Sequence, residues 1–218
     1  MDAVTISPTI ESRLHRIAFQ LALFTILYNI LEGFVATILG YDDKSLALFG
    51  FGADSFIEVI SGLGIAHMIV RMRMHPDRNR GTFERTALRI TGFSFYGLAT
   101  GLLATGVYNL STGHKPETTL WGVIISLVSI LIMWALIYGK TKVGNQLRSE
   151  AILADAECTR VCIYMSVVLL VSSGINEITK LPGVDAIGAL CLAALSFKEG
   201  KECFTKAASN ELCACKDD

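Results

Sequence analysis

Six long apolar segments run through this chain and constrain its fold more than any other feature. Each is about 20 residues or longer, enough to cross a hydrocarbon core of about 30 Å at a helical rise of about 1.5 Å per residue. Charged residues make up only 18% of the 218 residues, against about 25% in soluble domains. The sequence therefore predicts an all-α integral membrane protein, a bundle of six transmembrane helices. The predicted segments are residues 17–41, 46–70, 88–110, 118–138, 150–175 and 182–204.

Basic residues are concentrated in the connections on one side of this predicted bundle. Because positively charged loops remain in the cytoplasm, both termini are predicted to be cytoplasmic. This divides the chain into a cytoplasmic segment at 1–16, a transmembrane domain at 17–206 and a short cytoplasmic tail at 207–218. The basic residues on the cytoplasmic side are Arg13, Arg16, Arg71, Arg73, Arg78, Arg80, Arg85, Arg89, Lys140, Lys142 and Arg148, and those on the other side are only Lys44, Lys115 and Lys180.

The composition and the first segment exclude several other classes of protein. A net charge of −1 provides no broad basic field for nucleic acid. The sequence contains no evident nucleophile–base set or phosphate-binding loop, so we expect no enzyme. The apolar segment at 17–41 is too long for a signal peptide and lacks a small-residue cleavage site directly after it, so we interpret it as the first membrane helix. The predicted location is a multi-pass position in the inner or plasma membrane of the cell.

Two pairs of metal-capable side chains lie in the middle of these apolar segments. Asp54 and Glu58 are spaced i, i+4, and so are Cys158 and Cys162. Each pair therefore shares one face of its helix. Ionised carboxylates at bilayer depth are costly unless they meet a partner or a wet cavity, so we expect the first pair to have a function.

The predicted orientation places both pairs at the same depth. Counted from Leu46 on the outer side, the two carboxylates lie about 12 and 18 Å into the membrane. Counted from Glu150 on the inner side, the two thiols lie about 12 and 18 Å from the opposite surface. The midplane of a bilayer is about 15 Å from either edge. Topology and spacing therefore agree on a hypothetical cation site at the membrane midplane.

Two thiolates and two carboxylates suit a divalent metal with some soft character. Zinc accepts both sulfur and oxygen ligands, and the sulfurs favour cadmium or mercury more strongly. Magnesium and calcium are disfavoured because they prefer oxygen ligands. Since thiolates form when the metal binds, metal capture is expected to release protons.

Simpler interpretations of these residues remain open. All six cysteines lie in the second half of the chain, unlike a disulfide framework, and a buried cysteine is often only a small apolar side chain. The two carboxylates could form a polar network or pair with Arg160, although Arg160 could instead pair with Glu157 at i, i+3. A non-transporting membrane protein that senses metal or serves as a scaffold is the competing functional hypothesis.

Three parts of the sequence carry a family resemblance. They are residues 45–48 (SLAL) with 54–61 (DSFIEVIS), residues 154–162 (ADAECTRVC) and residues 184–186 (VDA). They resemble the second, fifth and sixth membrane helices of the cation diffusion facilitator family. In that family the second helix carries an Asp-Ser-x-x-Asp ligand pattern and the fifth carries Ala-Asp-x-x-His-x-x-x-Asp.

The resemblance implies export of a divalent cation, commonly zinc, in exchange for protons. On these motifs Asp54 takes the first ligand position, Glu58 the second Asp position, Cys158 the His position and Cys162 the last Asp position. The two cysteines are the main departure, because they replace a histidine and a carboxylate with soft ligands. No organic cofactor is implied.

The resemblance also implies a homodimer. Family members commonly carry a cytoplasmic metal-binding domain after the sixth helix, and we expect none in this chain. A dimer would then rely on membrane helices. The third segment offers a GxxxG pattern, Gly97 to Gly101, of the kind that supports close helix packing. Packing within a single bundle is the alternative interpretation of this pattern.

Further residues are candidates for accessory roles. Asn29 and Glu32 in the first segment could add a ligand or a proton relay, or bond to a neighbouring helix. Asp155, on the face of the cysteine pair, could guide cations from the cytoplasm, or be an ordinary acid at a helix start. Cys213 and Cys215 in the tail could capture a soft metal.

Overall fold

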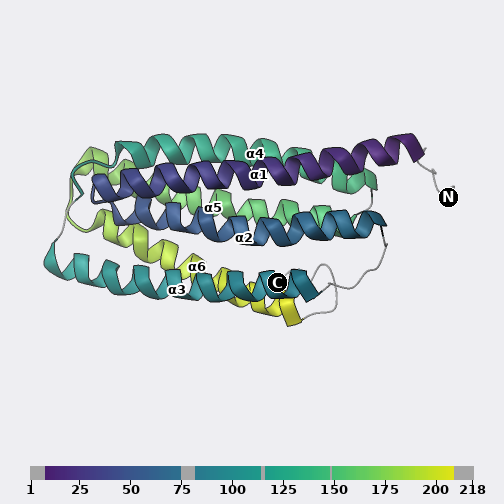
Figure 1. Ribbon diagram of the computed structural model, residues 1–218. Coiled ribbons are helices and arrows are strands. Elements are labelled where there is room, and N and C mark those ends of the chain that lie inside the picture. Colours follow the sequence, from purple (N-terminus) through teal and green to yellow (C-terminus); the bar gives the residue numbers. More distant parts are fainter. Residues whose placement is uncertain (1–7, 75–81, 114–115, 148, 209–218) are drawn as a thin grey trace.

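The computed structural model describes residues 8–74, 82–113, 116–147 and 149–208, which form six α-helices in an antiparallel arrangement (Figure 1). The start of α1 and the last turn of α6 lie toward the same end of the bundle (Figure 1). The predicted all-α six-helix bundle is therefore confirmed. The helices are α1 (Pro8–Asp42), α2 (Leu46–Met74), α3 (Thr82–Thr112), α4 (Leu120–Leu147), α5 (Glu150–Thr179) and α6 (Val184–Ala208).

Five helices in the described part of the chain, α1 to α5, are long and apolar enough to cross a membrane. The sixth helix is not among them, because charged residues such as Lys198 and Lys201 occupy its second half. Several helices also extend beyond the predicted segments. Arg71 lies within α2, and Arg85 and Arg89 lie within α3, so part of the predicted connection is helical. Arginine is a good helix former, which permits such extensions into the polar membrane surface.

The helices pack in three extensive pairs, α1 with α2, α3 with α6, and α4 with α5. The first pair approaches closely at Gly52, where a Cβ atom would stand 2.5 Å from the backbone nitrogen of Thr37. The α3–α6 pair is held by aromatic rings, with Tyr96 stacked on Phe204 at 5.5 Å and Phe93 edge-on to Phe204 at 4.9 Å. Small residues and aromatic contacts of this kind replace the hydrophobic effect as the source of packing within lipid.

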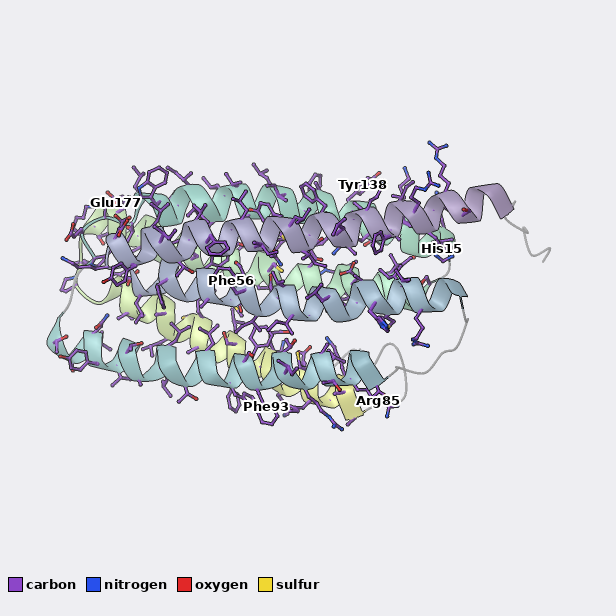
Figure 2. All side chains as sticks on the ribbon, viewed as in Figure 1. His15, Phe56, Arg85, Phe93, Tyr138 and Glu177 are labelled. Atoms are coloured by element: carbon purple, nitrogen blue, oxygen red, sulfur yellow. The ribbon has the colours of Figure 1, made fainter. Side chains whose placement is uncertain are left out.

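Polar side chains tie the helices together at the end opposite to the start of α1. Asp185 of α6 accepts hydrogen bonds from the Ser45 hydroxyl (2.6 Å) and the Leu46 amide (2.7 Å), and so caps α2. Glu177 of α5 accepts a bond from the Thr119 amide (2.9 Å) just before α4. Figure 2 shows Glu177 at this end of the bundle and His15 and Arg85 toward the other. In the predicted orientation, the end that contains Glu177 and Asp185 is the outer end.

Candidate metal-transport site

A cavity of about 50 Å³ lies among α1, α2, α3, α5 and α6. A cavity needs a volume of roughly 10–15 Å³ to hold one water molecule. This cavity therefore has room for a cation together with a few of its hydrating water molecules. Its walls combine apolar side chains with metal-capable ones. The polar and sulfur-bearing residues that line it are Thr25, Asn29, Glu58, Ser61, Asp155, Cys158, Thr159, Cys162, Glu199, Cys203 and Lys206.

Glu58 is the centre of the polar contacts in this cavity. Its Oε1 accepts a hydrogen bond from the Cys162 thiol at 2.7 Å, and its Oε2 accepts one from the Asn29 amide at 3.0 Å. Three helices, α1, α2 and α5, therefore meet at one carboxylate. The structure thus brings Glu58 and Cys162 into direct contact, and Cys158 lines the same cavity one turn away.

Asp54 occupies a different position from the other three predicted ligands. It is buried, with 4% of its surface exposed, but it does not line the cavity. Within the described residues its Oδ1 has no hydrogen-bond partner. Among the described residues, no three His, Cys, Asp or Glu side chains are grouped closely enough to hold a metal ion. The four predicted ligands are therefore not assembled into one coordination sphere in this conformation.

Glu32 lies outside the cavity, in a network between α1 and α2. It accepts hydrogen bonds from the Tyr28 hydroxyl (2.8 Å) and the Ser55 hydroxyl (3.2 Å). The bond to Ser55 is a bond to a neighbouring helix, one of the two alternatives that the sequence left open. Asn29, in contrast, lines the cavity and contacts a predicted ligand directly.

A buried ion pair joins α4 to α5 beside the cavity. The Lys140 ammonium, in a residue with 1% of its surface exposed, donates to Asp155 Oδ1 at 2.9 Å and to the Thr159 hydroxyl at 2.8 Å. The assignment of Lys140 to a cytoplasmic loop was wrong, because α4 continues to Leu147. Arg160 pairs with Glu157 at 2.8 Å on the surface, so it does not neutralise the carboxylates of α2.

Sequence reasoning missed two residues of the cavity, Glu199 and Cys203. Glu199 has charged neighbours in the sequence, Lys198 and Lys201, but it is half-buried and lines the same cavity as Glu58. The available signal was the i, i+4 spacing of Glu199 and Cys203, the same spacing as in the two predicted pairs.

The glycines of the third helix separate into two groups. Gly92 and Gly106 face α6, where added Cβ atoms would meet Phe204 and Leu190. Gly97 and Gly101 lie on the exposed side, and added Cβ atoms there would meet nothing within 4 Å. The GxxxG pattern is therefore not used for packing within the described chain. The tail cysteines Cys213 and Cys215 lie outside the described residues.

Comparison with known proteins agrees with the fold and the motifs. Residues 20–210 match the family model described as the cation efflux transmembrane domain. The chain is also similar to an uncharacterized transporter of Methanocaldococcus jannaschii, with 26% identity over 181 residues. That alignment covers 81% of this chain and 63% of the relative, so the chain spans less than two thirds of the relative's length. Because the family model covers most of the chain, the protein belongs to the cation efflux family, that is, the cation diffusion facilitators.

Proposed function

We propose that the protein exports a divalent transition-metal cation in exchange for protons, through alternating access to a midplane site. Zinc is the cation we expect, and cadmium or mercury are further candidates. The proposed ligands are Asp54, Glu58, Cys158 and Cys162. The observation that carries the proposal is the 2.7 Å contact between the Cys162 thiol and Glu58 Oε1 across α2 and α5, beside a cavity that Cys158 also lines.

The proposed exchange follows from the protonation of these groups. The Cys162 thiol keeps its proton while it donates to Glu58, and a metal ion that binds both groups must displace that proton. Binding to both thiols releases two protons for one divalent cation, so the exchange moves no net charge. Asp54, one turn from Glu58 and without a donor on Oδ1, would complete the site when α2 rotates or tilts in the transport cycle.

Flux measured in liposomes tests the transport function. The purified chain, reconstituted with a metal-sensitive dye inside the vesicles, is expected to move zinc and cadmium faster when a pH gradient is imposed than when the gradient is collapsed by an ionophore. Protein-free liposomes are the control. Absence of flux for zinc, cadmium, mercury and manganese under all gradients would refute transport and favour a metal-sensing or scaffold role.

The cysteine pair is expected to set the preference among metals. A Cys158→Ser/Cys162→Ser variant should lose cadmium flux more than zinc flux, because oxygen ligands favour cadmium less than thiolates do. Cys191→Ser is the matched control, since Cys191 is an exposed thiol of α6 that does not line the cavity. Unchanged zinc-to-cadmium selectivity in the double variant would remove the two sulfurs from the site.

A homodimer through α3 is the assembly we propose. The support is the exposed face of Gly97 and Gly101, which leaves space for close approach by a second helix. A Gly97→Leu/Gly101→Leu variant is expected to shift the detergent-solubilised protein from dimer to monomer in light scattering. Gly174→Leu is the control, because Gly174 of α5 also has open space around its Cα. Equal masses for wild type and both variants would exclude this interface.

A further inference from the structure

A third pair of metal-capable side chains borders the cavity. Glu199 and Cys203 come from α6, are spaced i, i+4, and both line the cavity that Cys158 lines from α5. Cys203 is a free thiol with 7% of its surface exposed. Neither residue belongs to the four proposed midplane ligands or to a family motif quoted above.

Asp155 adds a carboxylate oxygen to the same region. Its Oδ1 is held by the Lys140 ammonium, whereas its Oδ2 is buried and, within the described residues, has no hydrogen-bond partner. The residue is 5% exposed and lines the cavity. A buried carboxylate oxygen without a donor costs free energy, and a cation in the cavity is a ligand that would offset this cost.

These groups lie closer to the predicted cytoplasmic surface than Glu58 does. At about 1.5 Å per residue, Cys158 is about 12 Å from the start of α5 and Cys203 is about 8 Å from the end of α6. Glu58 contacts Cys162, which lies one turn, about 6 Å, further from the start of α5 than Cys158 does. A cation that enters from the cytoplasm would therefore reach Cys158 and Cys203 before Glu58.

We propose that Glu199 and Cys203, together with Asp155 and Cys158, form an inner station that receives a thiophilic divalent cation and passes it to the midplane ligands. Two thiols and two carboxylates suit zinc or cadmium. Cys158 belongs to both sets, so it is the ligand on which the cation changes from one set to the other. This inference rests on the proposed transport function.

Two features keep this station weak enough to release its cation. The ammonium groups of Lys140 and Lys206 border it, and they reduce the net negative charge that a cation meets. The donors are also not preassembled, since no three metal-capable side chains of the described residues are grouped for coordination. Binding must therefore draw α5 and α6 together. A transport pathway requires sites that bind strongly enough to be entered but weakly enough to be left.

Equilibrium binding of cadmium tests the inner station independently of transport. The experiment uses the full chain with Cys213→Ser and Cys215→Ser, which remove the tail thiols, and with Glu58→Gln and Cys162→Ser, which remove midplane ligands. We expect this background to bind cadmium with a thiolate charge-transfer band. Adding Cys203→Ser should weaken that binding at least about tenfold, whereas adding Cys191→Ser should leave it unchanged.

A second measurement uses the chain with only Cys213→Ser and Cys215→Ser, so that all the midplane ligands are kept. Bound cadmium is expected to slow modification of Cys203 by a small methanethiosulfonate reagent and to leave modification of Cys191 unaffected. Cadmium binding that is insensitive to Cys203→Ser, or equal modification rates with and without cadmium, would overturn the inner station. Because neither measurement needs flux, absence of transport with Cys203-dependent binding would refute the proposed function and not the station.

Discussion

Replacing Glu58 by glutamine is expected to reduce zinc flux into liposomes by more than about tenfold, because even groups that only orient a metal ligand alter metal affinity or activity by about 10–100-fold. Glutamine keeps the length of the side chain and can still contact Asn29 and Cys162. It removes the negative charge, which is the part of Glu58 that a divalent cation needs. The measurement is the initial rate of dye response under a fixed pH gradient.

Two controls separate this effect from a structural one. Glu58→Asp keeps a carboxylate and introduces the residue that the family pattern carries at this position, and it is expected to retain most of the flux. Glu117→Gln removes a carboxylate from the exposed pair with Lys44 in the outer connection, and it should have no effect on flux. If Glu58→Gln transports zinc at the wild-type rate, Glu58 is not a ligand of the transported cation.

Replacing Lys140 by methionine is expected to lower the free energy of unfolding by about 3–5 kcal/mol, the usual cost of leaving one partner of a buried ion pair without the other. The Lys140 side chain is fully buried, and its ammonium contacts both Asp155 and Thr159. Without it, the Asp155 carboxylate remains buried and has lost its counter-charge. Unfolding of the purified protein in detergent with added denaturant measures the change.

A double-mutant cycle identifies the pair as the cause. Lys140→Met/Asp155→Leu removes both charges and is expected to be considerably more stable than Lys140→Met alone, because replacement of both partners by apolar groups is often close to neutral. Lys142→Met is the matched control, since Lys142 is exposed on the same helix. If the free energy of unfolding of Lys140→Met lies within about 1 kcal/mol of the wild-type value, the buried ion pair contributes no more than an ion pair on the surface does.

The bundle was predictable because apolar segments of sufficient length leave few alternatives in a membrane. The helix ends were less predictable. Arg71, Arg85 and Arg89 indicated a connection by their charge, but the backbone continues as helix through all three. Charge locates the membrane surface, whereas helix ends depend on capping contacts such as that of Asp185 with Ser45, which join residues distant in sequence.

The candidate site was also predictable only in part, because spacing within one helix can be read from the sequence and contacts between helices cannot. Spacing within one helix placed Cys158 and Cys162 on one face, and motif similarity paired that face with α2. The position of the cavity along the helices was not predictable, and it decides that Glu58 lines the cavity while Asp54, one turn away on the same face, does not. Lys140 was misassigned because a lysine near the end of an apolar segment is usually exposed, and only its distant partner Asp155 explains its burial.

The cap that Asp185 forms on α2 also determines how the bundle can open. Two hydrogen bonds join the outer ends of α2 and α6. If these bonds persist while the two helices move, the outer ends stay together and the cytoplasmic ends separate by rotation about that point. A helix of 25 residues such as α6 is about 37 Å long. A tilt of only about 10° would therefore displace its far end by about 6 Å, twice the width of a water molecule, while the outer end stays closed.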